Sequence, residues 1–175
     1  MTSPSVPASV SDGLAAALAP VVGAPVEIAD LRRLTGGASR ETWSFTANGE
    51  PLILRRDPPG RPGAPGQMRR EADIMRACTR AGLRAPEVLL DDDGTHFGTN
   101  GLVMRSVPGE TIARRILRDD EYAAARRVLV PQLAEFLAGL HAIDPAEVPG
   151  TESHKTSITA RSRSPSRVTP QSYPR

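Results

Sequence analysis

The dipeptide Asn48-Gly49 constrains the fold of this chain more than any other local feature. It lies between two runs, residues 42–47 and 51–56, that have the β-branched, aromatic and aliphatic content of strands. Asn-Gly favours the left-handed backbone of a two-residue turn, which joins neighbouring antiparallel strands. We therefore predict a tight hairpin here, and an antiparallel sheet built around it.

The remaining elements extend this hairpin into a domain of strands and helices. Apolar and polar residues alternate over 26–34, which predicts a strand with a kink after Ile28. Residues 57–66 hold four Pro and three Gly and predict a loop. Further strands are predicted over 86–90 and 102–107, a turn over 91–94, and helices over 14–18, 67–81, 111–117 and 119–141, the last kinked or divided at Pro131. Because hairpins join the strands and a helix follows the third, we expect an α+β fold and not a doubly wound sheet.

The formal net charge of +2 combines two opposite parts, −2 over residues 1–150 and +4 over residues 151–175. The mixed charge of residues 1–150 makes them a poor electrostatic candidate for broad nucleic-acid binding.

The only cysteine is Cys78, which excludes an intrachain disulfide and a multi-cysteine zinc site. No run approaches the roughly 20 apolar residues of a membrane span, and residues 14–26 lack the basic flank of a secretory signal. We expect a cytoplasmic protein that does not enter a membrane.

Composition changes abruptly at Thr151. Residues 151–175 include 10 Ser or Thr and have no apolar periodicity, so we predict a disordered basic tail over 149–175, and disorder over 1–10 as well. This tail, with its Arg–Ser run at 161–167, has three possible origins. It could be a frame change or truncated gene product after about position 150, a natural basic tail, or a nucleic-acid-binding tail. We favour the first.

Four features in order could carry chemistry. The Gly36-Gly37 turn follows a strand, and glycines let backbone N–H groups approach phosphate oxygens, although such a turn alone is usually only a hairpin. Arg55 ends the third strand on the face opposite Arg56, and read alone it could be a solvated strand end. Glu71 lies within the apolar stripe of helix 67–81, formed by Met68, Ile74, Met75, Cys78 and Ala81.

A carboxylate within an apolar stripe needs a partner unless it reaches solvent at the stripe's edge, and Arg55 is the natural partner of Glu71. The fourth feature is the apolar run at 102–107 that ends at Pro108-Gly109. It is typical of a hinge between two lobes, or of an ordinary strand-to-helix turn. The acidic run Asp91-Asp92-Asp93-Gly94 lacks the spacing of a calcium loop, and we interpret it as a solvated turn.

Together these features resemble the N-terminal lobe of the protein-kinase-like fold. They are most similar to the aminoglycoside phosphotransferase family, including its branch related to the domain attached to some acyl-CoA dehydrogenases. The matching stretches are LRRLTGGASRETWSF, PLILRRDPPG, RREADIMRA, GLVMRSVPGET and LAEFLAGLHAIDP, within residues 11–148. The resemblance implies a lobe over 11–107, with a five-stranded antiparallel sheet and one packed helix. A hinge and the first helices of a truncated C-lobe would follow over 108–148.

The resemblance also implies an ATP site. The glycine turn would cover the phosphates, although a full G-x-G-x-x-G is not present. Arg55 matches the position of a phosphate-binding lysine, with Glu71 as its ion-pair partner. The implied cofactor-binding residues are Gly36, Gly37, Ala38, Ser39, Arg55 and Glu71, and the backbone of Met104, Arg105, Ser106 and Val107 for adenine.

The family transfers the γ-phosphoryl group of ATP to a hydroxyl group of a small molecule, and uses Mg²⁺ and a loop resembling H-G-D-x-x-x-x-N. None of His96, His141 and His154 is followed by Gly-Asp. We therefore expect a lobe fragment with weak or residual ATP binding, no catalytic residues and no Mg²⁺ ligands. The alternative is a non-catalytic protein-interaction module with a basic disordered tail. In either case the apolar face Leu133–Leu140 would be uncovered, which favours self-association.

Overall fold

The structure is a computed structural model that describes residues 10–34 and 39–148. Its elements, in chain order, are α1 (Val10–Val22), β1 (Ile28–Leu34), β2 (Glu41–Ala47), β3 (Glu50–Arg56), α2 (Gln67–Arg80), β4 (Val88–Asp93), β5 (Asn100–Arg105), α3 (Ala113–Arg118), the 3-10 helix η1 (Asp120–Tyr122), α4 (Ala123–Ala142) and the 3-10 helix η2 (Pro145–Glu147). The α+β fold expected from the sequence is confirmed.

The predicted hairpin joins β2 to β3. Asn48 and Gly49 have φ angles of 49° and 84°, the left-handed pair that a type I′ turn requires, and Ala47 pairs with Glu50 across it. Asn48 also accepts a hydrogen bond on its side-chain oxygen from the Glu27 N–H at 2.8 Å. The turn residue therefore fixes the hairpin and ties it to the chain that enters β1.

The five strands form one antiparallel sheet in the order β1-β2-β3-β5-β4. The kink predicted after Ile28 is a break in the β1–β2 register between Ala29 and Arg32, where Asp30 has a φ of 53°. In this strand order, β3 is the central strand, with hydrogen-bonded neighbours along both of its edges.

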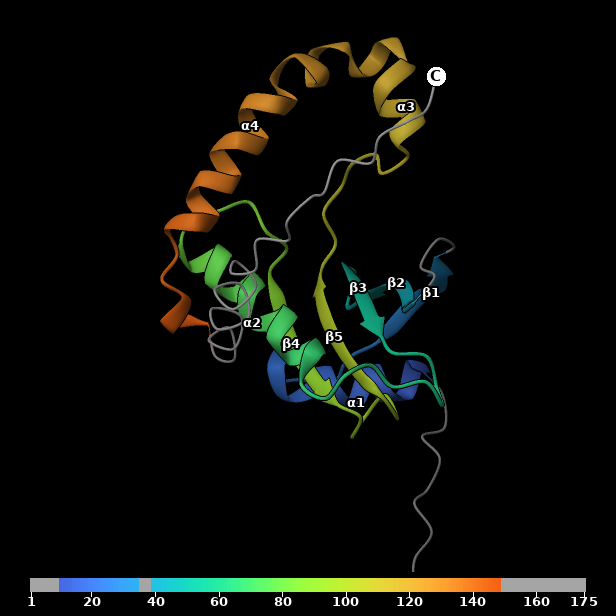
Figure 1. The fold of residues 1–175 in the computed structure, drawn as a ribbon. Helices are drawn as coiled ribbons and strands as arrows, with labels where there is room; N and C mark the ends of the chain where they lie inside the picture. The colour runs from blue at the N-terminus through green and yellow to red at the C-terminus, as the bar shows by residue number, and fades with distance from the viewer. Residues whose placement is uncertain (1–9, 35–38, 149–175) are drawn as a thin grey trace, which may run out of the picture.

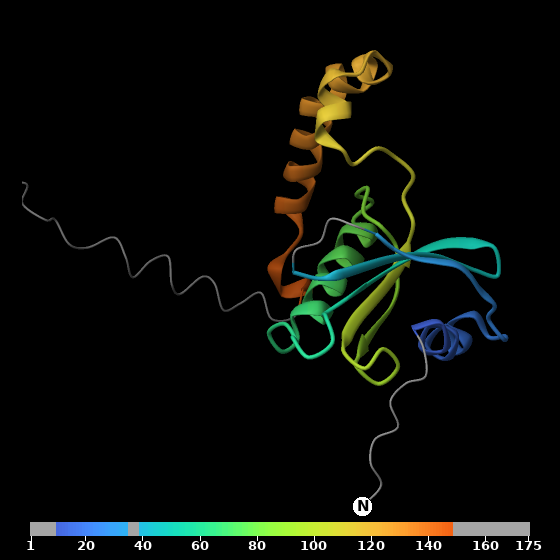
Figure 2. The same ribbon diagram turned by 90° about the vertical axis from the view of Figure 1, so that its right-hand side faces the viewer.

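A helix packs on each face of the sheet, as Figure 2 shows. On one face, Leu14 and Leu18 of α1 pack against Leu54 and Val103, and all four are fully buried. On the other face, α2 packs on Leu102 through Met68 and Ala72. Burying one such aliphatic side chain stabilises the fold by about 1.5–3 kcal/mol. The sequence prediction of one packed helix did not include α1, which continues through Pro20 to Val22 because proline in the last turn removes a single helical hydrogen bond.

The predicted stripe of α2 is wrong at two positions, because Ile74 and Ala81 are exposed, whereas Ala72 and Ala77 are buried. The helix ends as expected at Gly82, whose φ is 74°. There the N–H of Leu83 donates to the Cys78 carbonyl at 2.9 Å, closing the helix end.

The interpretation of residues 91–94 as a solvated turn is also wrong. Asp91, Asp92 and Asp93 belong to β4 and pair with β5. Asp92 is buried and accepts hydrogen bonds from the backbone N–H groups of Gly94, His96 and Phe97 and from the His96 ring. A carboxylate that accepts several N–H groups replaces its lost water contacts, so this acidic residue stabilises the β4–β5 connection.

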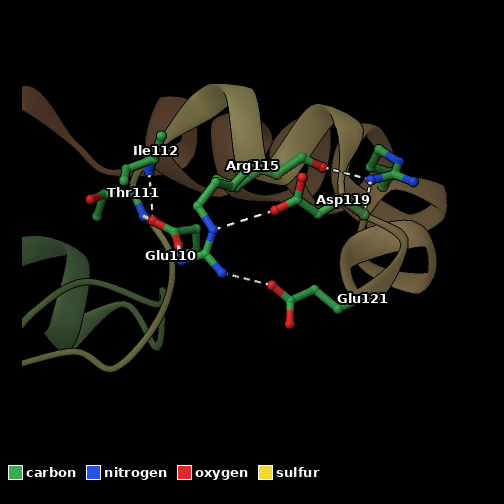
Figure 3. Close-up of polar contacts among 8 residues, drawn as sticks. Glu110, Thr111, Ile112, Arg115, Asp119 and Glu121 are labelled. Atoms are coloured by element: carbon green, nitrogen blue, oxygen red, sulfur yellow. Dashed lines mark hydrogen bonds and ion pairs between the residues drawn. The ribbon is translucent and has the colours of Figure 1, made fainter.

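Beyond β5, residues 106–112 lead to a helical arm formed by α3 and α4 that stands away from the sheet (Figure 1). The Glu110 carboxylate accepts hydrogen bonds from the N–H groups of Thr111 and Ile112, both at 2.8 Å, and is paired with Arg115 (Figure 3). The hydrogen bond from Ile112 is the main cause that holds the pKa of Glu110 below its ordinary value. This carboxylate therefore satisfies the first free N–H groups of the arm.

Pro131 does not divide α4, which runs without interruption from Ala123 to Ala142 and returns toward the end of α2 (Figure 1). A Cβ added at Gly139 would lie 2.5 Å from the Leu83 side chain, so the two segments touch there.

We predict that Gly13→Ala destabilises the fold by about 1–3 kcal/mol, although alanine is the better helix former. The added Cβ would lie 2.4 Å from the His96 carbonyl oxygen, a backbone atom that cannot move without disturbing the β4–β5 connection. Urea denaturation would measure the change.

Gly139→Ala is the matched control, since its Cβ meets only the end of the flexible Leu83 side chain. We expect it to change stability by less than about 1 kcal/mol. Equal stability of Gly13→Ala and the wild-type chain would contradict the packing described for α1.

Candidate functional site

Arg55 and Glu71 meet between the sheet and α2. Arg55 lies on β3 and shares its face with Ile53, since both pair with residues of β5 that pack under α2. Its guanidinium forms an ion pair with Oε1 of Glu71, and the two side chains are 31% and 27% exposed. The pairing predicted from the sequence is therefore present, at a position that solvent still reaches.

Arg40 is a third member of this cluster, and sequence reasoning missed it. It pairs with the other Glu71 oxygen, Oε2, and its Nε lies 3.5 Å from Oδ1 of Asp57. The Arg40 side chain is only 14% exposed and Asp57 only 5%. No spacing or periodicity marks either residue, because they are brought together by the sheet register and by the loop after β3.

Asp57 anchors the loop rich in Pro and Gly that follows β3. Its carboxylate accepts a hydrogen bond from the Gly63 N–H at 2.8 Å and one from the Asn100 side chain at 3.4 Å. A Cβ at Gly63 would lie 3.1 Å from this carboxylate, so glycine allows the close approach. We call Arg40, Arg55, Asp57 and Glu71 the arginine–carboxylate cluster; it has two positive and two negative charges.

A cavity of about 420 Å³ opens beside the arginine–carboxylate cluster. Its lining combines charged groups with two apolar side chains of α2; the residues are Arg55, Gln67, Arg70, Glu71, Ile74 and Met75. The guanidinium groups of Arg55 and Arg70 make this a place where an anionic group would be favoured.

The glycine turn cannot be placed against this cavity. Gly36, Gly37 and Ala38 lie outside the described residues. Ser39 is described and exposed, and it directly precedes Arg40. Their contact with phosphate groups stays a prediction.

The adenine contacts predicted for residues 104–107 need a correction at two backbone donors. The N–H of Arg105 donates to the Glu87 carbonyl at 2.9 Å and that of Ser106 to the Pro51 carbonyl at 3.0 Å, so neither can donate to an adenine. Antiparallel pairing continues past the end of β5, which the sequence did not reveal. Met104 packs toward α2, and the N–H of Val107 has no partner among the described residues.

A buried ion pair, Arg56 with Glu41, lies on the opposite face of the sheet. Glu41 accepts a hydrogen bond from Arg56 at 2.8 Å and one from Trp43 at 3.3 Å, and the Arg56 guanidinium stacks over Trp43. Burial raises the pKa of Glu41, but the hydrogen bonds from Arg56 and Trp43 and the nearby positive charges outweigh it, so the net pKa is lowered.

The described residues bring together no group of three or more His, Cys, Asp or Glu side chains suited to a metal ion. Within the same residues, every helix is too short or too polar to cross a membrane.

The fold is a lobe of the protein-kinase-like class. It has a five-stranded antiparallel sheet, a helix that forms an ion pair with the third strand, and a last strand that leads to further helices. Residues 30–172 match the model described as the phosphotransferase enzyme family, and the chain belongs to that family. The matched range runs past Thr151. The family model therefore also covers residues that follow the change in composition. No curated protein is similar enough to match the chain.

Solved structures share the fold. A Ralstonia eutropha JMP134 protein assigned as an aminoglycoside phosphotransferase has 18% identity and a TM-score of 0.57, over 79% of this chain and 40% of that chain. A fructosamine-3-kinase assigned in Haemophilus somnus 129PT has 17% identity and a TM-score of 0.53, over 75% and 39%. A mutant of aminoglycoside phosphotransferase APH(4)-Ia, in complex with AMP-PNP and hygromycin B, has 22% identity and a TM-score of 0.51, over 77% and 40%. The chain thus spans about 40% of the length of these proteins.

We predict that Glu41→Gln destabilises the fold by about 1.5–3 kcal/mol at pH 7, because it leaves the Arg56 charge buried without its counter-charge. The pKa of Glu41 is lower in the folded than in the unfolded state, so ionised Glu41 contributes to the free energy of unfolding. This contribution is complete above the unfolded-state pKa and disappears as pH falls through the folded-state pKa. The variant should therefore lose less stability than the wild-type chain on acidification below pH 4.5, the ordinary value for this carboxyl. Thermal unfolding from pH 7 to pH 3 would measure this, and parallel curves would contradict it.

Proposed function

We propose that this chain forms the nucleotide-binding lobe of a phosphotransferase that moves the γ-phosphoryl group of ATP to a hydroxyl group of a small molecule. The ion pair between Arg55 and Glu71, beside a cavity, is the observation that carries the proposal. Family membership supports the reaction class. That a structure of the same fold was solved with AMP-PNP supports the nucleotide.

Arg55 is suited to hold a polyphosphate. A guanidinium presents five N–H donors in a fixed plane that fits phosphate oxygens, and Glu71 occupies only one of its nitrogen atoms. Residues 1–150 contain no lysine, so arginine is the side chain of this lobe that carries a permanent positive charge. The N–H groups of Arg105 and Ser106 are bonded to other parts of the protein. Adenine could therefore form hydrogen bonds with the Val107 N–H and with the carbonyl groups of the segment after β5.

We further propose that the 175-residue chain alone does not complete the transfer. The sequence contains no H-G-D loop. Stabilising the charge of phosphoryl transfer needs fixed donors or metal ions around the γ-phosphate. Mg²⁺ would supply such stabilisation when bound, but the described carboxylates of Asp57, Glu71 and Asp92 are already engaged with protein groups.

A second function, protein interaction, is favoured by the exposed apolar surface of α4. None of its side chains is buried, and Val130, Leu133 and Leu137 are 71%, 58% and 49% exposed. A cavity of about 350 Å³ lies between this helix and the end of α2, lined in part by Leu83, Leu133 and Phe136. A helix with so much apolar surface in water favours self-association.

The first test measures ligand-induced thermal stabilisation of the whole chain. We expect ATP to raise the melting temperature, adenosine to raise it less, and Arg55→Ala to remove the difference, because that variant lacks the phosphate contact. Arg69→Ala is the matched control, since this α2 arginine is exposed and does not line the cavity. Stabilisation by ATP that Arg55→Ala leaves intact would contradict the proposed site.

The proposal of inactivity is tested separately, by following ADP release from Mg²⁺-ATP in the presence of small polyols. We expect no release above the background without protein. Steady turnover that Arg55→Ala abolishes would refute the proposal of inactivity and would keep the nucleotide site.

Self-association is tested by sedimentation velocity. We predict that Leu133→Glu combined with Leu137→Glu reduces the mean sedimentation coefficient at high concentration, because both charges fall on exposed apolar positions. Gln132→Glu is the control for added charge on the same helix. An unchanged distribution in the double variant would exclude this face as the contact.

A further inference from the structure

Glu71 holds two arginines at once, one with each oxygen. Arg55 from β3 contacts Oε1, and Arg40, which lies directly before β2, contacts Oε2. This arrangement is not needed to neutralise Arg55, for which one carboxylate suffices. The second arginine, Arg40, therefore has another effect on the pair.

The effect of Arg40 follows from the geometry of arginine–carboxylate pairs. A carboxylate with both oxygens free tends to form two parallel hydrogen bonds with one guanidinium. Such a pair would use two nitrogen atoms of Arg55. With Oε2 occupied by Arg40, Glu71 accepts from a single Arg55 nitrogen, Nη1. The other Arg55 donors have no partner among the described residues and stay free for phosphate oxygens.

Asp57 fixes the position of Arg40. Its Nε lies 3.5 Å from Asp57, whose buried carboxylate is fixed by the Gly63 N–H and the Asn100 side chain. The Arg40 side chain is more buried than that of Arg55, which leaves it little freedom to leave Glu71. A continuous chain of contacts thus runs from the loop after β3, through Arg40, to the pair beside the cavity.

The net charge of the arginine–carboxylate cluster also indicates that Arg40 supports phosphate binding. With both arginines and both carboxylates ionised, the arginine–carboxylate cluster is neutral. Without Arg40 it would carry two carboxylates and one guanidinium, a net negative charge beside the place proposed for a polyphosphate. Charges within a few ångströms interact strongly in such partly buried surroundings.

We propose that Arg40 is a positioning residue that limits Glu71 to one hydrogen bond with Arg55 and so keeps the remaining Arg55 donors free for phosphate oxygens. This inference rests on the proposed nucleotide function and deepens it, because it names the residue that sets the phosphate affinity of the site.

The test compares wild-type protein, R40Q, R40K, R55A and the control R69Q as whole chains, with ATP and adenosine as probes in calorimetric titrations. We expect R40Q to weaken ATP binding at least about fivefold, which is the lower range for a coupling between distinct sites, and to leave adenosine binding within about twofold, close to equal affinity. R40K keeps the charge and should bind ATP with an affinity between those of wild-type and R40Q protein. If R40Q binds ATP as the wild-type chain does while R55A does not, the inference fails and the proposed function survives.

If the wild-type chain binds no ATP, the proposed function fails, and a second measurement decides the inference. Double-mutant cycles with R55Q and E71Q, measured by urea unfolding, give the coupling between those two residues in the wild-type and R40Q backgrounds. We expect the coupling, expressed as a ratio of unfolding constants, to rise at least about threefold when Arg40 is removed, because Glu71 can then give both oxygens to Arg55. Unchanged coupling would overturn the inference. If R40Q does not fold, D57N, which releases Arg40 from its anchor, takes its place in both measurements.

Discussion

Two consecutive arginines at the end of the central strand have to be neutralised on opposite faces of the sheet. Because side chains alternate along β3, Arg55 faces α2 and Arg56 faces the cluster around Trp43. Arg56 finds Glu41 in a buried pair, whereas Arg55 finds Glu71 in a pair that solvent still reaches. The buried pair stabilises the sheet, and the half-exposed pair leaves a guanidinium beside a cavity. The same local pattern thus produces a structural contact on one face and a candidate binding site on the other.

The features that the sequence predicts well are those set by neighbours along the chain. The Asn48-Gly49 turn depends on local backbone preference, the separation of Arg55 from Arg56 on strand alternation, and the end of α2 on Gly82. Even the pairing of Arg55 with Glu71 follows from two such periodicities, because a strand face and a helix face have to meet. The family resemblance adds the proposal that this pair forms part of a nucleotide site, which periodicity alone does not indicate.

Features set by contacts across the fold could not be predicted in this way. Arg40 and Asp57 come together only through the register of β2 and β3 and the path of the loop that follows. Asp92 reads as one of three solvated carboxylates until the chain folds back on it. The hinge donors of Arg105 and Ser106 are used by residues far away in sequence, Glu87 and Pro51. In each case a polar group is satisfied by a partner that no local pattern specifies.

The central claim is that a nucleotide binds beside the Arg55–Glu71 pair, and amide hydrogen exchange of the whole chain with and without ATP tests it most directly. The account predicts slower exchange with ATP at the end of β3, in the first turns of α2 and in the segment after β5, with little change in the exposed α4. Protection confined to α4, or unchanged exchange at β3 and α2, would contradict it.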